Sequence, residues 1–338
     1  MNKRRILTGD RASGQLHLGH YIGSIVNRLK LQETYDCFFL IADYHAFTTG
    51  YEKPEEIRES SRNIFVDYLS VGLDPEKSTL FLQSAIPEHA ELYLLFNMLV
   101  TIARAQRIPT LKDKLEDMHL EEGLASLGLL GYPVLQAADI LIYKANVVPV
   151  GDDQLSHLEL TREIARRFNH LYGETFPEPE ALLSDFSRLP GIDGQKKMSK
   201  SLGNDIAFAH SASEVENRVN AMVTDPAKIR KNDPGHPDIC TVYAFHQAFN
   251  KRNTPVIAEA CRMGQLGCVE DKRHLARILN ELLDPIRMRR QELLTHPAQL
   301  EETFAFGTEK ARQVARSTME EVRMKMCLGA PLFSRNPL

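Results

Sequence analysis

The 338-residue sequence contains no tryptophan, and it has no apolar run close to the roughly 18–20 residues that a membrane-spanning helix needs. Positive charge is not in excess, because 41 Lys and Arg residues against 45 Asp and Glu residues give a formal net charge of −4. This balance excludes a highly basic nucleic-acid-packaging protein, although it leaves a local basic face open. With 43% hydrophobic residues, 19 glycines and 17 prolines, the composition is that of an ordinary folded protein with a large core.

Cysteine is also scarce, and its five copies are scattered at Cys37, Cys240, Cys261, Cys268 and Cys327. This spacing is not that of a disulfide framework, which favours a reducing compartment. The first residues, MNKRRILTGD, include basic side chains but no apolar stretch, so no signal peptide is predicted. We therefore expect a cytoplasmic protein that does not associate with a membrane.

The first half of the chain alternates short β-rich runs with helical stretches. We predict strands at 5–8, 37–41, 79–83 and 146–150, and helices at 17–31 and 54–72. The run at 37–41 is apolar throughout, as expected of a strand that is buried on both faces of a parallel sheet. The alternation predicts a doubly wound, Rossmann-like α/β fold that binds its ligands at the carboxyl ends of the strands.

The second half has a different pattern, in which apolar residues recur at helical spacing with no convincing strand between them. We expect an α/β domain over 1–205, with a mostly helical insertion at about 88–130, and an all-helical domain over 206–338.

The first chemically informative segment is TGDRASGQLHLGHYIGS, residues 8–24. A strand, a glycine-containing turn and a helix place backbone amides where an anion can bind. His17 and His20 lie three residues apart, and both can donate hydrogen bonds to phosphate oxygens. Gly19 gives a flat group such as a nucleobase access to the backbone. The competing interpretation is that one histidine caps the helix and the other packs against the protein.

The second segment is DGQKKMSKSLGN, residues 193–204. Lys196, Lys197 and Lys200 flank two serines in a glycine-bounded loop, and their ammonium groups can meet a polyphosphate. Alone, such a loop is more often a solvated surface feature.

Together, HLGH near the first strand and KMSKS near the end of the α/β region resemble the two signatures of class I aminoacyl-tRNA synthetases. The resemblance covers essentially the whole chain, including a helical anticodon-binding domain. It implies that the protein activates an amino acid with ATP, and that Mg²⁺ accompanies the ATP.

A third segment, residues 131–169, contains YPVLQAADILIY followed by VPVGDDQLSHLELTREIARRFN. This pattern resembles the tryptophanyl-tRNA synthetases. The resemblance implies that Asp139 accepts the indole N–H of tryptophan, the only donor that the ring offers. A solvent-facing Asp139 is the alternative, but its apolar neighbours argue against it. Tyrosyl-tRNA synthetases are the nearest relatives of this family, so a tyrosyl-type specificity is the second hypothesis.

The same matching implies the other site residues. Those expected to act in catalysis are His17, His20, Lys114, Lys197 and Lys200. Those expected at the ATP are Arg11, Ala12, Ser13, Gly19, His20, Gly151, Asp152, Asp153, Lys197, Met198, Ser199, Lys200 and Ser201. Those expected at the tryptophan are Leu7, Ala42, Tyr132, Gln136, Asp139 and Gln154. Lys112 is a weaker match for a phosphate-contacting lysine than Lys114.

Some positions depart from the commoner bacterial pattern. Gln136 stands where a methionine usually packs on the indole, Arg11 and Ala12 replace Gln-Pro, and Leu7 and Ala42 are smaller or less branched than usual. A polar Gln136 either hydrogen-bonds Asp139 or admits a substituted ring. These departures suggest a divergent enzyme, and they leave open a paralogue that supplies adenylate or regulates without charging tRNA.

The resemblance also implies partners. We expect tRNA(Trp), L-tryptophan and ATP as substrates, and a homodimer with the insertion at its interface, where the apolar run at 92–102 fits. Basic residues of the helical half form a candidate RNA-binding face, namely Lys272, Arg273, Arg277, Arg287, Arg289 and Arg290. Some members of the family carry a four-iron cluster on cysteines spaced like those at 240, 261 and 268. Because Asp271 occupies the fourth position, we do not expect an iron–sulfur cluster.

Overall fold

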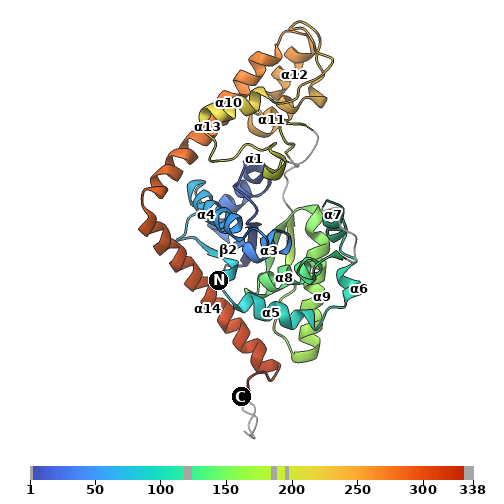
Figure 1. Ribbon diagram of the computed structural model, residues 1–338, viewed down its shortest axis with the longest axis vertical. Coiled ribbons are helices and arrows are strands. Elements are labelled where there is room, and N and C mark those ends of the chain that lie inside the picture. The colour runs from blue at the N-terminus through green and yellow to red at the C-terminus, as the bar shows by residue number, and fades with distance from the viewer. Residues whose placement is uncertain (1–2, 118–123, 184–188, 195–197, 331–338) are drawn as a thin grey trace.

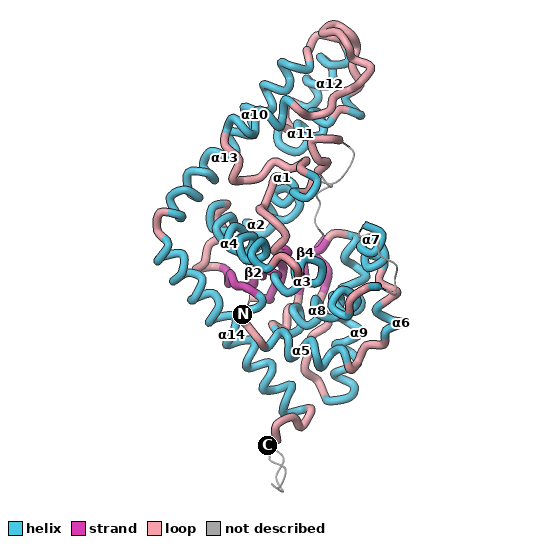
Figure 2. Tube along the Cα trace, in the orientation of Figure 1, coloured by secondary structure: helices cyan, strands magenta, loops and turns pink. Residues whose placement is uncertain are grey.

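The computed structural model describes residues 3–117, 124–183, 189–194 and 198–330. Its centre is a parallel five-stranded sheet with the strand order β3-β2-β1-β4-β5 (Figures 1 and 2). The strands are β1 (Arg5–Arg11), β2 (Asp36–Ala42), β3 (Ser78–Leu82), β4 (Val147–Val150) and β5 (Glu180–Leu183). The predicted doubly wound α/β fold is confirmed.

Strand β5 was not predicted from the sequence. It lies at the edge of the sheet and pairs only with β4, from Val147 opposite Glu180 to Val150 opposite Leu183. Glu180 and Leu183 are exposed, so the segment lacks the continuous apolar run by which central strands were recognised.

Alternation along β2 divides the core between the two faces of the sheet. Phe38 and Leu40 belong to a cluster that also contains apolar side chains of the helices on one face. Phe39 and Ile41 belong to a second cluster with the helices on the other face. Successive strand residues point to opposite faces, so the apolar run at 37–41 supplies both cores.

The predicted helix at 17–31 is three consecutive segments, because a π-helical turn interrupts it. These are α1 (Leu18–His20), the π-turn η1 (Tyr21–Ile25) and α2 (Val26–Thr34). Single π-turns inside helices often occur at functional sites. The two histidines of the first motif therefore lie on the short turn before the interruption.

Helices fill the connections between the remaining strands of the α/β region. They are α3 (Asp43–Gly50), α4 (Pro54–Ser70), α5 (Glu88–Asn97), α6 (Ile102–Ala105), α7 (Pro109–Asp117), α8 (Leu127–Ile142) and α9 (Leu155–Tyr172), with short 3₁₀ turns η2 (Gln83–Ala85) and η4 (Asp152–Gln154). The expected helical insertion corresponds to α5, α6 and α7.

The rest of the chain is helical, as expected. After the 3₁₀ turn η5 (Lys200–Leu202) come α10 (Ala212–Asn220), η6 (Pro237–Ile239), α11 (Thr241–Phe249), α12 (Thr254–Arg262), α13 (Cys268–Leu294) and α14 (Pro297–Lys325). Among the described residues from 206 to 330 there is no strand, apart from an isolated bridge between Ala207 and His17.

Helix α14 returns to the α/β region, as Figure 1 shows. Its buried residues Ala311, Ala315 and Met319 share a core cluster with Phe38 and Phe81 of the sheet. The proposed boundary at residue 205 stays a prediction, but the last helix packs on the first domain. None of the helices within the described ranges is long and apolar enough to cross a membrane.

Candidate active site

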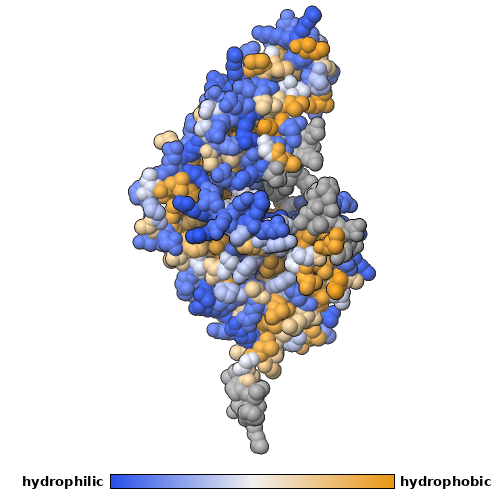
Figure 3. Space-filling model, in the orientation of Figure 1, coloured by the Kyte–Doolittle hydropathy of each residue, from blue (hydrophilic) through white to orange (hydrophobic). Residues whose placement is uncertain are grey.

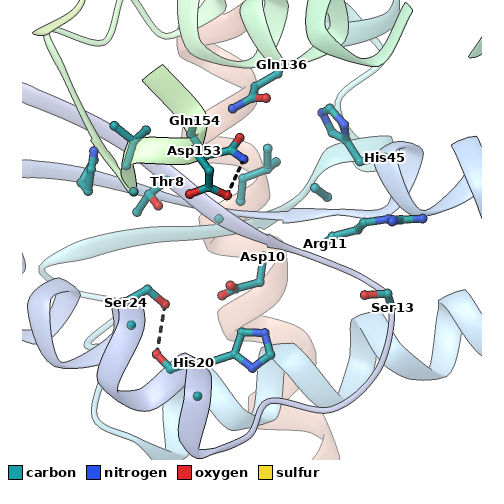
Figure 4. A pocket seen from close by; sticks show the side chains of 18 of the residues that line it. Thr8, Asp10, Arg11, Ser13, His20, Ser24, His45, Gln136, Asp153 and Gln154 are labelled. Atoms are coloured by element: carbon teal, nitrogen blue, oxygen red, sulfur yellow. Dashed lines mark hydrogen bonds between the residues drawn. The ribbon is translucent and has the colours of Figure 1, made fainter. Parts of the chain in front are cut away.

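A cavity of about 990 Å³ opens at the carboxyl ends of β1, β2 and β4. Chain connections leave in opposite directions on either side of the β1–β4 pair, and this switch point is where ligands bind in open α/β sheets. Figure 4 shows Gln136 and His45 on one side of the cavity, His20 and Ser24 on the other, and Asp10 between them.

Nearly all the site residues predicted from the sequence meet in this cavity. Those that line it are Leu7, Arg11, Ser13, His17, Gly19, His20, Ala42, Lys114, Tyr132, Gln136, Asp139, Gly151, Asp152, Asp153, Gln154, Met198, Ser199 and Lys200. Ala12 is fully buried in the core beneath the turn. Lys197 and the side chain of Ser201 lie outside the described residues. The chemical role of each of these residues stays a prediction.

His17 and His20 hold the first turn of the helix in a reciprocal arrangement. His17 is the N-cap residue, and its Nδ1 accepts a hydrogen bond from the Gly19 amide at 3.1 Å, while Nδ1 of His20 accepts from the His17 amide at 3.2 Å. A neutral ring whose Nδ1 accepts carries its proton on Nε2. Both residues thus cap the helix and also present an Nε2–H donor, so the two interpretations of the motif are compatible.

Position 19 must be glycine because the His17 ring lies against it. A Cβ at this position would lie 2.9 Å from two atoms of the His17 ring and 3.5 Å from Cβ of Met198. The spacing H-x-G-H therefore has a steric reason. It also brings the second motif into contact with the first, because Met198 is 2% exposed and packs beside the same turn.

Lys200 lies over the glycine-containing loop of the first motif. Its Cδ is 2.7 Å from the position that a Cβ would occupy at Gly14, whose φ of +146° also favours glycine. Next to it, the Ser199 amide donates to Oδ1 of Asn204 at 2.8 Å. The loop of the second motif is thereby folded against the loop of the first, with an ammonium group at the cavity wall.

Lys114 enters the cavity from α7, whereas the weaker candidate Lys112 is exposed and does not line it. Nζ of Lys114 lies 3.5 Å from the centroid of the Tyr132 ring, a cation–π contact. Burial, with a smaller effect from the charge of Arg11, lowers the pKa of Lys114 to about 8. This lysine is therefore the better match for the predicted phosphate contact.

Asp139 is 2% exposed and is held by three side chains. Gln83 Nε2 donates to both carboxylate oxygens at 2.7 and 2.9 Å, His89 Nδ1 lies 2.7 Å from Oδ1, and His45 Nε2 lies 2.8 Å from Oδ2. Burial opposes the charged form, but the hydrogen bonds and charges of the two histidines outweigh it and lower the pKa of Asp139. The structure thus places an ionised carboxylate in the cavity wall.

Gln136 does not supply any of the described contacts to Asp139, which corrects one of the two alternatives for this residue. Its Oε1 instead accepts from Nδ1 of His157 at 2.6 Å. Burial, with smaller effects from Lys114 and His45, lowers the pKa of His157 to about 4, so the ring is neutral. Its Nε2 then accepts from the Thr110 hydroxyl at 2.5 Å. Gln136 lines the cavity, and its amide NH₂ is left as a hydrogen-bond donor there.

A largely buried network at the cavity wall was not predicted from the sequence. The Arg28 guanidinium contacts Oδ2 of Asp10 at 2.6 Å and the Tyr68 hydroxyl at 3.0 Å, and that hydroxyl donates to the same Asp10 oxygen at 2.8 Å. Burial raises the pKa of Asp10, but the Arg28 charge and hydrogen bonds outweigh this and lower it. The three residues are far apart in the sequence, and no local pattern indicated the network.

A second missed contact ties α13 to the first motif. Asp67 accepts from the Leu16 amide at 3.2 Å and pairs with Arg290 Nε at 2.9 Å. Burial raises the pKa of Asp67 to about 6, against the opposing effect of Arg290. Arg290 therefore serves an internal contact, which corrects its assignment to the RNA-binding face.

Arg287 is also engaged, with Asp284 at 2.9 Å and with Asn280 at 2.5 Å. Of the six basic residues proposed for the RNA-binding face, the exposed ones are Arg273, Arg277 and Arg289.

Comparison with known proteins identifies the family. Residues 1–284 match the family model described as tRNA synthetases class I (W and Y). The chain is 48% identical to a tryptophan–tRNA ligase of Thermotoga maritima, an alignment that covers 96% of this chain and 99% of the relative, and 49% identical to that of Treponema pallidum, covering 96% and 97%.

A solved tryptophanyl-tRNA synthetase of Campylobacter jejuni, complexed with ADP and tryptophan, superposes with a TM-score of 0.85 at 34% identity. That match covers 96% of this chain and 100% of the other. The chain belongs to the class I tRNA synthetases of the tryptophanyl and tyrosyl family.

Proposed function

We propose that this protein is a tryptophan–tRNA ligase, which joins L-tryptophan to ATP as an adenylate and then transfers the amino acid to tRNA(Trp). One observation carries the proposal. The histidine and lysine turns of the two class I motifs and the buried carboxylate of Asp139 line the same cavity. The names of the relatives at 48–49% identity support the choice of amino acid.

The amino-acid end of the cavity, by which we mean Leu7, Ala42, Tyr132, Gln136 and Asp139, suits an indole. Leu7 and Ala42 offer apolar walls, and Asp139 offers an acceptor. A ring N–H directed at this buried charge would gain a charge-assisted hydrogen bond that an analogue without the N–H cannot make, which gives discrimination. Tyr132, together with Gln154, would bind the ammonium and carboxylate groups.

The ATP end, by which we mean His17, His20, Gly151, Asp152, Asp153 and Lys200, would hold the nucleotide. The Asp152 and Asp153 carboxylates, exposed on η4, can accept from the ribose hydroxyls. The Nε2–H groups of the histidines and the ammonium groups of Lys114 and Lys200 would bind the phosphates. Lys197 and Ser201 are assigned there by motif alone.

The first step is an in-line displacement. A tryptophan carboxylate oxygen attacks the α-phosphorus, and the bond to pyrophosphate breaks with the electron pair leaving on the bridging oxygen. Negative charge grows on oxygens near the imidazole N–H and ammonium donors, which lower the barrier without forming a covalent bond to the substrate. In the second step the terminal adenosine hydroxyl of tRNA attacks the acyl carbonyl and releases AMP.

Mg²⁺ would enter with ATP. It prefers oxygen ligands and is usually held in part by substrate phosphates. The Asp10 carboxylate, which lies between the two ends, is already bound by Arg28 and Tyr68. The residues of the ATP end therefore fit an ion carried by the phosphates, whose charge it would partly neutralise.

We further propose a homodimer that works on tRNA in the cytoplasm. Leu94, Met98 and Ile102 of α5, α6 and the segment between them are 58%, 67% and 64% exposed. Figure 3 shows apolar surface over this part of the molecule, at the lower right. A contiguous apolar patch of this kind is typical of a protein interface. Replacing Met98 by glutamate should give monomers in sedimentation velocity, and an unchanged mass would exclude this surface.

Charging of tRNA tests the function directly. Purified protein, ATP, Mg²⁺ and unfractionated tRNA are incubated with labelled tryptophan or labelled tyrosine, and acid-precipitable label is counted. Tryptophan alone should be incorporated. Incorporation of tyrosine would establish the tyrosyl-type specificity. Adenylate formation without any charging would establish the non-charging paralogue.

A further inference from the structure

The helical half contains a compact cluster of metal-ligating side chains far from the cavity, between α11 and α13 (upper part of Figure 1). His246 of α11 and Asp271 and His274 of α13 each bring a ligand atom within 4.8 Å of the others. Asp271 and His274 are three residues apart, so they share one face of α13. Val242 and Phe245 of α11 pack in the same core cluster as Leu275 of α13, which fixes the two helices beside each other.

The polar atoms at the centre of this cluster lack hydrogen bonds. Nε2 of His246 and Oδ1 of Asp271 approach to 3.0 Å, yet within the described part of the chain neither atom has a hydrogen-bond partner. The His246 side chain is fully buried and Asp271 is 9% exposed. Buried polar atoms are normally satisfied, so an unsatisfied pair calls for an explanation such as a bound water molecule or ion.

We propose that His246, Asp271 and His274 bind one Zn²⁺ ion that joins α11 to α13. Two imidazole nitrogens and a carboxylate oxygen form a donor set that zinc prefers, with bonds of about 2.0–2.2 Å. A small rotation of the half-buried His274 brings the three atoms to one ion, and a water molecule on that side completes four-coordination. The carboxylate offsets part of the ionic charge.

The surroundings of His246 fit this role. Its outer nitrogen Nδ1 contacts the Asn250 side-chain amide at 3.2 Å, which fixes the ring with Nε2 toward Asp271. Rotation of that amide by half a turn would present its oxygen to Nδ1–H, the arrangement that leaves the Nε2 lone pair for the metal.

The proposed ligands differ from those of an iron–sulfur cluster. Cys240, Cys261 and Cys268 are free thiols in the same half of the chain, but the described ligand atoms that converge are two imidazoles and a carboxylate. Asp271 also occupies the fourth position of the cluster spacing. The two kinds of site are therefore distinguished by the two histidines on one side and the three cysteines on the other.

Metal analysis separates these possibilities without relying on enzymatic activity. Untagged protein, purified without chelators, should contain one zinc per chain by elemental mass spectrometry. Protein stripped of metal should bind one Co²⁺ with the visible absorption of a four-coordinate ion. His274→Ala, at a half-buried position, and Asp271→Asn should both lose the ion. The control His236→Ala removes an exposed histidine that pairs with Asp225 at 2.9 Å, and it should keep the ion.

Three results would overturn the proposal. The first is wild-type protein that neither contains zinc nor binds Co²⁺. The second is zinc that persists in both His274→Ala and Asp271→Asn. The third is iron, or any metal, that is lost in Cys261→Ser but kept in His274→Ala. Because the readout is metal content, failure here leaves the proposed tRNA ligase activity untouched, and failure of that activity leaves the site untouched.

Discussion

The two ends of the cavity are built on different physical principles. At the amino-acid end, the charge of Asp139 is buried and its oxygens are held by Gln83, His89 and His45. At the ATP end, Lys200 is exposed and the two carboxylates of η4 are open to solvent. A prearranged buried acceptor is suited to selecting one ring, whereas exposed charges are suited to gathering around a polyphosphate that arrives and leaves.

The largest expected effect is at the amino-acid end. Asp139→Asn keeps the side-chain shape but removes the charge that three donors surround. Truncating one partner of a buried, charged hydrogen bond between two binding partners costs about 2–5 kcal/mol. At about 1.36 kcal/mol for each factor of ten, we expect kcat/KM for tryptophan in pyrophosphate exchange to fall by about 30- to 5,000-fold. KM for ATP serves as the control, and an equal loss for both substrates would contradict the separation of the two ends.

At the ATP end the expected pattern is reversed. Lys200→Ala should lower the rate of adenylate formation by about 10²–10³-fold, as for loss of one preorganised transition-state donor. Tryptophan binding should be unchanged. Since the protein contains no tryptophan, the fluorescence of the ligand itself reports binding. Lys112→Ala, an exposed lysine outside the cavity, is the matched control. Weakened tryptophan binding with a normal rate of adenylate formation would show that Lys200 does not act at the ATP end.

Lys114 should give the ATP end a pH dependence. Its pKa of about 8 means that the ammonium form, which the phosphates need, is lost as pH rises through 8. We expect kcat/KM for ATP, which reports the free enzyme, to fall above pH 8 by up to about tenfold per pH unit. In Lys114→Arg the charge persists, so the decline should disappear. A decline that is identical in the variant would exclude Lys114 as its source.

The smallest effect concerns the support of the ATP end by Asp67. Its pKa of about 6 in the folded protein lies above the ordinary value of 3.8. The folded state therefore binds more protons between about pH 4 and 6, and this contribution to stability, about 1–3 kcal/mol, is lost as pH rises through that window.

Asp67→Asn should remove this loss. The free energy of unfolding is measured by urea titration at several pH values between about 4 and 6. The change across this window, from its acidic to its less acidic end, should be more favourable to the folded state in the variant than in the wild type. Asp238→Asn, at an aspartate 80% exposed, should leave the pH profile unchanged. Parallel profiles for wild type and Asp67→Asn would contradict the assignment.

The sequence predicted the site better than it predicted what holds the site in place. Periodicity and unbroken apolar runs identified the central strands and the helical half, and the motifs identified the residues of the cavity. The edge strand β5 was missed because half of it faces solvent.

The partners of Asp139 were missed for a different reason. His45, Gln83 and His89 lie 50 to 94 residues away along the chain, and only the folded sheet brings them together. The same holds for Arg28 with Asp10 and for Arg290 with Asp67.

Pyrophosphate exchange with tryptophan and tyrosine as competing substrates tests the central claim most directly. The residues of the two class I motifs and the buried carboxylate of Asp139 line one cavity. Exchange should therefore require tryptophan and ATP together, should be negligible with tyrosine, and should fall strongly for tryptophan in Asp139→Asn. Exchange that is faster with tyrosine, or exchange with tryptophan that is undiminished in Asp139→Asn, would contradict the proposed function.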